Sequence, residues 1–266
     1  MAYGPSPHNM LDIYDPASGA AVAPVVVFFY GGGWTSRDRA IYRFVARSLS
    51  ACGVLVIIPD YRVGPEAAFP GFLQDTVAAV AQARPMAPGH SGDPACLFLM
   101  GHSAGAYIAA MLALDPIWVA EAGMGTRDTL AGVLGIAEPC DFLPLKDPVL
   151  QQIFEPSGPN TQPISFAQNA TMPFLLMTGT SAVRVDPCTS QRLATRVRMK
   201  GGQAEARLYP GLGNVAVLKV IAAPLWFLGP VREDTCQFLG VPPPGRSAAT
   251  FSARLAQLGQ KMAYQR

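Results

Sequence analysis

One serine between two glycines has the strongest potential for chemistry in this sequence. Residues 101–105 read Gly-His-Ser-Ala-Gly, which places Ser103 at the centre of a G-x-S-x-G pattern. The apolar run 96–100 leads directly into this pattern, and the small-residue segment 104–114 follows it. On such a strand-to-helix turn a serine hydroxyl is exposed and held in a strained conformation, where it can attack a carbonyl carbon. The pattern therefore predicts a nucleophile at Ser103.

Three consecutive glycines provide the second chemical signal. Residues 30–34 read Tyr-Gly-Gly-Gly-Trp and follow the apolar run 25–29. Glycines leave backbone N–H groups unobstructed, and converging N–H donors stabilise the negative oxygen that develops in acyl transfer. We predict an oxyanion hole formed by Gly32, Gly33 and the N–H of Ala104, rather than a flexible glycine-rich turn. A phosphate-binding loop is not expected, because the segment lacks the G-x-x-x-x-G-K-[ST] pattern.

Apolar runs and helical patterns alternate along the chain and would position these groups. Most of the runs are apolar at nearly every residue, as expected of parallel strands covered on both faces. The predicted strands are residues 25–30, 54–59, 96–101, 130–136, 173–179 and 205–210. The predicted helices are residues 37–51, 71–84, 104–114 and 187–200. This alternation predicts an α/β fold with a mostly parallel, doubly wound sheet flanked by helices.

Prolines mark two of the predicted helix boundaries. The helix 71–84 is expected to end before Pro85, because proline cannot donate to the helical ladder. The helix 187–200 is expected to begin with Asp186 as its N-cap and Pro187 in its first turn.

Together, these motifs resemble the esterase and lipase group of α/β-hydrolases related to hormone-sensitive lipase. YGGGW (30–34) is similar to the HGGGW motif, with Tyr30 in the histidine place, and GHSAG (101–105) matches the elbow. PDYRVGPEAAFP (59–70) matches a segment of bacterial members. The resemblance extends over most of the chain, to about residue 240, and implies the α/β-hydrolase fold. It also implies carboxylic-ester hydrolysis by a Ser–Asp–His triad, with no cofactor and no metal.

Only the nucleophile of this triad carries over to the chain. Residues 178–187 and 209–214 align with the late segments that hold the acid and the base in the family. The resemblance places Ala182 at the position of the acid and Asn214 at the position of the base. In this family the chain order is serine, acid, histidine, whereas here every histidine precedes Ser103. The three histidines are His8, His90 and His102.

Two other side chains are weaker substitutes for the missing groups. Asp186 lies four residues after Ala182 and is interpreted as a helix cap rather than as a replacement acid. Lys219 could act as the base of a Ser–Lys dyad, but nothing in the sequence places its amine near Ser103. The double loss fits both an engineered, disarmed variant and a natural relative that lost hydrolysis and kept its pocket.

An asparagine at the base position would remove the proton chemistry and keep much of the shape. Its amide does not titrate, so it offers no general base at any pH. Loss of the base in a serine triad costs on the order of a millionfold in turnover, although the remaining site retains about a thousandfold over water. We therefore predict a carboxylic-ester hydrolase that is disarmed or weakly active. The alternative is a non-catalytic binding or scaffold protein that holds a small apolar ligand.

Apolar side chains near the predicted site would select the ligand. We predict that Trp34, Phe142, Leu218 and Trp226 line the substrate pocket, although ordinary core packing explains each of them equally well. Such a lining would favour a small lipophilic ester.

The composition is that of a globular protein with a large apolar interior. Of the 266 residues, 50% are hydrophobic and 14% are charged, and the net charge is +2. So small a basic excess gives no reason to expect nucleic acid or an anionic membrane as a partner. The N-terminus lacks the pattern of a signal peptide. Neither apolar segment, 20–30 or 215–231, is a convincing membrane span.

The five cysteines are widely spaced and include no pair with metal-ligand or CxxC spacing. We interpret them as reduced thiols of a cytoplasmic protein, most of them small core residues without a redox role. They are Cys52, Cys96, Cys140, Cys188 and Cys236.

A single domain is expected over residues 1–240, with pocket or cap-like loops at 138–172 and 215–231. Residues 241–266 would form a linker and a C-terminal amphipathic helix. Packing of this helix on its own domain is favoured over pairing with a second subunit in a homodimer. Its apolar positions are Phe251, Leu255, Leu258 and Met262.

Overall fold

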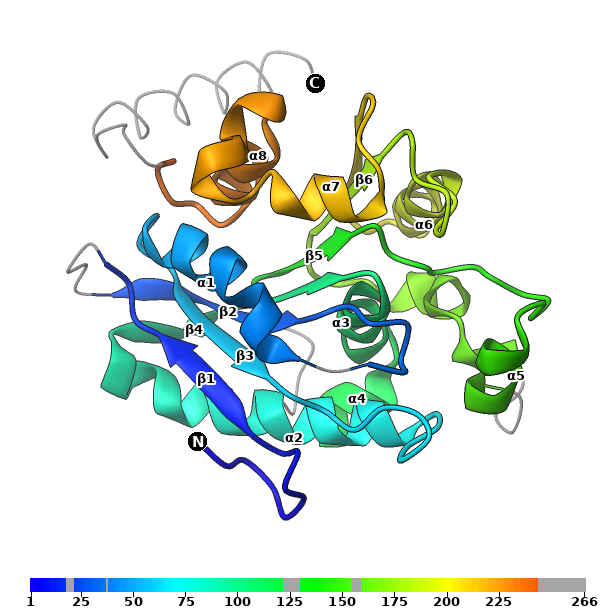
Figure 1. Ribbon diagram of the computed structural model, residues 1–266, viewed down its shortest axis with the longest axis horizontal. Coiled ribbons are helices and arrows are strands. Elements are labelled where there is room, and N and C mark those ends of the chain that lie inside the picture. Colours follow the sequence, from blue (N-terminus) through cyan, green and yellow to red (C-terminus); the bar gives the residue numbers. More distant parts are fainter. Residues whose placement is uncertain (18–21, 37, 122–129, 155–158, 244–266) are drawn as a thin grey trace.

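A seven-stranded sheet forms the centre of the molecule, in the order β1-β3-β2-β4-β5-β6-β7 (Figure 1). The computed structural model describes residues 1–17, 22–36, 38–121, 130–154 and 159–243, except for five side chains in helices: Val119, Pro159, Ala223, Pro224 and Trp226. The strands are β1 (Leu11–Tyr14), β2 (Ala23–Phe29), β3 (Leu55–Pro59), β4 (Gly92–His102), β5 (Gly132–Ile136), β6 (Phe174–Gly179) and β7 (Ala204–Tyr209). β1 pairs antiparallel with β3, and all other pairs are parallel. This is the predicted fold, an α/β-hydrolase fold with a mostly parallel sheet.

Helices cover both faces of the sheet because successive strands are added first on one side of β2 and then on the other. β3 lies on one side of β2, and β4 lies on the other. Right-handed crossovers therefore place the helix after β2 and the helix after β3 on opposite faces. Figure 1 shows α1 (Arg43–Ser50) and α2 (Gly71–Met86) on opposite sides of β1 and β3. With both faces covered, β3, β5 and β6 are buried at every residue.

The remaining helical segments are mostly short. The α-helices are α3 (Ala104–Leu114), α4 (Pro116–Glu121), α5 (Pro148–Phe154), α6 (Cys188–Met199), α7 (Asn214–Lys219) and α8 (Val231–Phe238). The 3-10 segments are η1 (Arg39–Tyr42), η2 (Ala87–His90), η5 (Pro159–Thr161), η6 (Pro163–Asn169) and η7 (Ala223–Leu228). Within the described residues, no helix is both long enough and apolar enough to cross a bilayer.

The six predicted strands and four predicted helical regions are all present, with two differences. The helix expected to end before Pro85 continues to Met86, because the fixed φ of proline suits a helix and the last turn continues into η2. The strand β1 was not predicted. Its four residues are too few to show a period, and it lies at the edge of the sheet, where most of its residues are only partly buried.

The segments outside the predicted strands follow the expectations in part. Residues 138–172 leave the sheet after β5 and include α5, η5 and η6, which Figure 1 shows beside α6 and α3. Asp186 caps α6, since its carboxylate accepts the N–H of Cys188 at 2.9 Å. The C-terminal helix predicted within residues 241–266, after the linker, lies outside the described residues, and the division at residue 240 stays a prediction.

Candidate active site

Ser103 occupies a sharp turn between β4 and α3. Its backbone has φ 52° and ψ −120°, a region that residues with a side chain rarely adopt. A Cβ at Gly101 would lie 2.2 Å from the carbonyl oxygen of Gly105, and a Cβ at Gly105 would lie 2.0 Å from that of Phe29. Both glycines of the pattern are therefore required by the close approach of the backbone. The N–H of Ser103 donates to Ile136 at 2.8 Å, which anchors the turn to β5.

The segment 30–34, which holds three consecutive glycines and is called the glycine loop from here on, runs beside this turn. A Cβ at Gly31 would lie 3.2 Å from the Cβ of Ser103, and one at Gly32 would lie 2.3 Å from the carbonyl oxygen of Ser36. Gly33 has a φ of 61°. Within the described residues, the N–H groups of Gly32, Gly33 and Ala104 make no backbone hydrogen bond. Gly31 thus brings this loop beside the serine, and the oxyanion hole at Gly32, Gly33 and Ala104 stays a prediction.

The loops after β6 and β7 are joined at the positions where the family holds its acid and base. The N–H of Ser181 donates to the carbonyl of Leu212 at 2.9 Å. A Cβ at Gly179 would lie 2.1 Å from the same carbonyl oxygen. Asn214 begins α7, and its Oδ1 accepts the backbone N–H of Arg184 at 3.0 Å. The Asn214 amide therefore reaches across to the loop that carries Ala182.

The nitrogen of the Asn214 amide has no hydrogen-bond partner in the described part of the chain. This atom, Nδ2, is buried. Because the N–H of Arg184 needs an acceptor, the amide orientation is fixed, with oxygen toward Arg184 and nitrogen away from it. The side chain at the expected base position therefore presents a donor, and no acceptor, to its remaining surroundings.

His102 lies between residue Gly31 and the start of α7. Its Nε2 is 2.9 Å from the carbonyl oxygen of Asn214, so this nitrogen carries the proton. Its Nδ1 is buried without a partner in the described chain and would lie 2.8 Å from a Cβ at Gly31. Burial lowers the pKa of His102, which weakens it as a proton acceptor. We assign His102 a positioning role between the glycine loop and the start of α7.

The two weaker substitutes are engaged elsewhere. The Asp186 carboxylate caps α6 and also faces Arg192, with Oδ2 3.4 Å from a guanidinium nitrogen. Hydrogen bonding to the N–H of Cys188 lowers the pKa of Asp186. Lys219 is exposed and lies at the end of α7 opposite Asn214. Neither side chain has a contact that links it to Ser103.

The predicted pocket residues divide into three groups. Trp34 and Phe142 come together, with ring centroids 5.9 Å apart, in an aromatic cluster with Tyr107 and Phe154. Leu218 belongs to α7, and its side chain is buried in the core. The side chain of Trp226 lies outside the described residues. Trp34 and Leu218 therefore both have the burial of core residues, Phe142 is partly buried, and the pocket lining stays a prediction.

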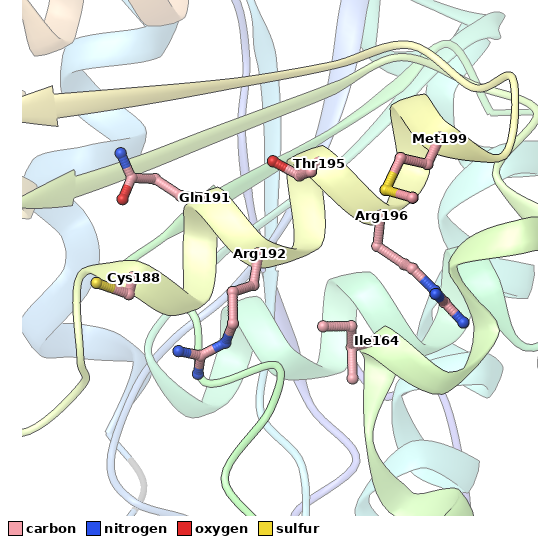
Figure 2. Close-up of a pocket in the computed structure, with 7 residues that line it drawn as sticks. All are labelled: Ile164, Cys188, Gln191, Arg192, Thr195, Arg196 and Met199. Atoms are coloured by element: carbon pink, nitrogen blue, oxygen red, sulfur yellow. The ribbon is translucent and has the colours of Figure 1, made fainter.

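A separate open hollow of about 320 Å³ lies along α6 and contains none of the predicted site residues. In Figure 2, Arg192 and Arg196 project from α6 on the side of Ile164. Arg192 is paired with Asp141 at 3.0 Å and with Asp186, so its charge is already compensated. We assign this hollow no role in the candidate site.

Glu138 is a buried carboxyl that the sequence reasoning missed. It follows β5, is fully buried, and has no hydrogen-bond partner for either oxygen within the described residues. Ser190 lies nearby, but the two side chains do not reach hydrogen-bonding geometry. Burial raises the pKa of Glu138 to about 8, so the side chain is largely neutral at pH 7. The signal available in the sequence was an acidic residue two positions after the wholly apolar strand β5.

Comparisons with known proteins agree with this architecture. The BD-FAE family model matches residues 11–126, a range that includes the glycine loop and Ser103 but neither Ala182 nor Asn214. A protein of Arabidopsis thaliana named as a probable isoprenylcysteine alpha-carbonyl methylesterase is 27% identical over 79% of the chain, and the match covers 49% of the plant protein. The chain thus spans about half the length of that relative.

A second relative carries a different kind of name. A gibberellin receptor of Arabidopsis thaliana is 41% identical over 66 residues, which cover 24% of this chain and 18% of the receptor. Among solved structures, the apo form of esterase 2 from Thermogutta terrifontis superposes with a TM-score of 0.75 at 21% identity, over 90% of this chain and 92% of the esterase. That likeness concerns the fold.

Proposed function

We propose that this chain, which has the α/β-hydrolase fold and resembles esterases in sequence, is a carboxylic-ester hydrolase with Ser103 as nucleophile and with weak or no turnover. The observation that carries the proposal is the Asn214 amide, whose oxygen is occupied by the N–H of Arg184. An amide in this position cannot take the proton of a serine hydroxyl at any pH.

The proposed chemistry uses the groups that converge on the turn after β4. The Ser103 hydroxyl would attack the ester carbonyl carbon, and the N–H groups of Gly32, Gly33 and Ala104 would stabilise the resulting oxyanion. The N-terminus of α3 adds a favourable field for this negative charge. The missing step is removal of the serine proton, because Ala182 has no carboxylate and Asn214 has no basic nitrogen.

A lipophilic ester is the substrate class that we propose for this site. The exposed valines Val183 and Val215 flank Asn214 on the two joined loops. The partly buried ring of Phe142 supplies aromatic surface, packed against the buried ring of Trp34. A small apolar ester would bury these surfaces on binding, which favours association. The name of the plant methylesterase, which refers to an isoprenyl-bearing ester, is compatible with this class.

Restoring the two missing groups tests the proposal directly. We expect the double variant Ala182→Asp/Asn214→His to hydrolyse p-nitrophenyl butyrate at least a thousandfold faster than the unmodified chain, because it regains a general base and its orienting acid. Adding Ser103→Ala to the double variant should abolish the gain. Asn214→Gln is the matched control, since it changes the side chain without supplying a base and should leave turnover low.

Two outcomes would contradict the proposal. Ordinary turnover by the unmodified chain that is abolished by Ser103→Ala would mean that a base is present after all. A restored double variant that folds, as judged by circular dichroism, but hydrolyses no aryl ester of short or medium chain length would remove the hydrolase interpretation.

The second candidate function is binding of a small apolar ligand without catalysis. Its specific support is the structural use of Asn214, which ties two loops together, and the partial match to a protein named as a receptor. Calorimetric titration with a medium-chain alkyl methyl ketone distinguishes the candidates. The ketone has the carbonyl of an ester but no leaving group. Tight binding that is unaffected by Ser103→Ala would favour the binding function.

We further propose a cytoplasmic location and an independent monomer as the working form. The first rests on the five free thiols of the described structure. The second rests on the predicted packing of the C-terminal helix on its own domain. Size-exclusion chromatography with light scattering would test it, and a dimer would instead favour the alternative in which this helix pairs with a second subunit.

A further inference from the structure

Two cysteines that are far apart in the sequence meet between α1 and α8. Cys52 follows α1 and Cys236 lies within α8, and they are 184 positions apart. Their sulfur atoms are 2.8 Å apart, and the Cys236 thiol points toward Cys52. The two sulfur atoms are therefore direct neighbours, which is the first requirement for a disulfide. Both side chains are buried, Cys52 with 6% of its surface exposed and Cys236 with none.

The surroundings favour a reactive sulfur at Cys52. A hydrogen bond from Cys236 lowers the pKa of Cys52; burial acts against this shift, and the positive charge of Arg232 supports it. Arg232 is itself almost fully buried, and its Nε has no partner in the described chain. A buried guanidinium with an unpaired donor is stabilised by a nearby anion, and a thiolate would be that anion.

The second sulfur is suited to the opposite role. The hydrogen bond that stabilises a thiolate at Cys52 raises the pKa of Cys236, which therefore stays protonated until Cys52 reacts. The pair thus has one sulfur poised to react first and one poised to follow, an arrangement typical of redox-active dithiols.

We propose that Cys52 and Cys236 form a redox modification site that a peroxide converts to an intramolecular disulfide. The Cys52 thiolate attacks the peroxide, so that an S–O bond forms, the O–O bond breaks and hydroxide leaves to become water. The sulfur of Cys236 then attacks Cys52, forming the S–S bond and releasing a second water. Two thiols and one hydrogen peroxide thereby give one disulfide and two waters, and two electrons pass from sulfur to oxygen.

The disulfide would add a covalent link between the first and last parts of the described chain, which already meet at another point. The Ser48 hydroxyl of α1 donates to the carbonyl of Ile221, just after α7, at 2.5 Å. Because the bridge closes a loop of more than 180 residues, it strongly restricts the unfolded chain. Its formation therefore stabilises the fold and is independent of ester turnover.

Mass spectrometry of the oxidised full-length chain tests the site. The reduced protein is treated with hydrogen peroxide, alkylated in denaturant and digested with trypsin. We expect peptides 48–62 and 233–246 to be recovered linked, two hydrogens lighter than their sum, and separated again by dithiothreitol. Buried Cys140 donates to the carbonyl of Thr189 and should stay fully alkylated as an internal control. The melting temperature should rise by on the order of 10 °C.

Variants separate this site from the other thiols. Cys236→Ala should lose both the linked peptides and the oxidant-dependent rise in melting temperature. Cys188→Ser removes an exposed thiol and should retain both. Recovery of Cys52 and Cys236 as alkylated thiols, under conditions that fully oxidise Cys188, would overturn the proposal. So would recovery of Cys52 as a sulfinic or sulfonic acid with Cys236 still reduced.

Discussion

At the scale of single residues, the site is defined by how Asn214 uses its two polar atoms. Its oxygen satisfies the N–H of Arg184, and its nitrogen is buried without a partner in the described chain. A histidine there could hold the same loop by one nitrogen and still offer the other to a serine. The amide keeps the tie between the loops. If Asn214 occupies the proposed base position, the fold would be retained while the chemistry is weakened.

Glu138 gives a prediction about the pH dependence of stability. Its pKa is about 8 in the folded protein and about 4.3 in an unfolded chain. Between these values the folded state binds more protons, so the free energy of unfolding falls as pH rises from about 4.5 to about 8. The slope contributed by one group is at most about 1.4 kcal/mol per pH unit. Glu138→Gln should remove this contribution, as measured by urea denaturation at several pH values.

The control for this prediction is Glu121→Gln. Glu121 is exposed at the end of α4, and its substitution leaves the buried carboxyl in place. The decline of stability between pH 5 and pH 8 should therefore persist in this variant. If Glu138→Gln shows the same decline as the unmodified chain, burial of a neutral carboxyl is not its cause.

At the scale of elements, the turn between β4 and α3 depends on the absence of side chains. We expect Gly105→Ala to destabilise the protein by about 3 kcal/mol, because a Cβ would lie 2.0 Å from the backbone oxygen of Phe29. The backbone at Phe29 cannot move away from an added Cβ as easily as the end of a long side chain could. Urea denaturation followed by circular dichroism measures the loss.

A second glycine provides the matched control. No atom lies within 4 Å of a Cβ built at Gly89, and this residue has no positive φ. Gly89→Ala should therefore change the free energy of unfolding by no more than about 0.5 kcal/mol. Equal effects of the two substitutions would show that the close approach at Gly105 relaxes at little cost.

The aromatic cluster around Trp34 also belongs to this scale, because it joins four separate segments. Trp34 of the glycine loop meets Tyr107 of α3 edge-on, with centroids 5.3 Å apart, and Phe154 of α5 at 4.9 Å. The Tyr107 hydroxyl donates to the carbonyl of Thr161 at 2.6 Å. The excursion 138–172 is therefore fixed against the loop that would hold the oxyanion.

At the scale of the whole molecule, distant parts of the chain are joined by single polar contacts. The Ser48 hydroxyl donates to Ile221, 173 positions away, in a buried environment. We expect Ser48→Ala to destabilise the protein by about 1 to 2 kcal/mol, because the carbonyl of Ile221 would stay buried without its donor. Thermal unfolding measured by calorimetry detects this change.

Ser165→Ala serves as the comparison for this contact. Ser165 lies in η6 and is exposed, so removal of its hydroxyl should change the melting temperature very little. An effect of Ser48→Ala no larger than that of Ser165→Ala would mean that water replaces the lost hydroxyl.

The sequence by itself determined the alternation of strands and helices, and with it the fold. Parallel strands buried on both faces must be apolar throughout, and this pattern is visible without coordinates in β3, β5 and β6. The glycines around Ser103 were equally visible, since a close backbone approach excludes every other residue. The absence of a histidine after Ser103 was a fact of chain order alone.

Only the tertiary structure decided which side chains meet across the fold. The reasoning from spacing treated the cysteines as separate core residues, because Cys52 and Cys236 share no local pattern. The assembled fold brings the residue Cys52, just after α1, to α8, so that the two sulfur atoms lie 2.8 Å apart. Likewise, the bond between Asn214 and Arg184 depends on how two loops meet, and the raised pKa of Glu138 depends on complete burial. Local sequence constrains each backbone segment, whereas contacts between segments arise only when the sheet and its helices are assembled.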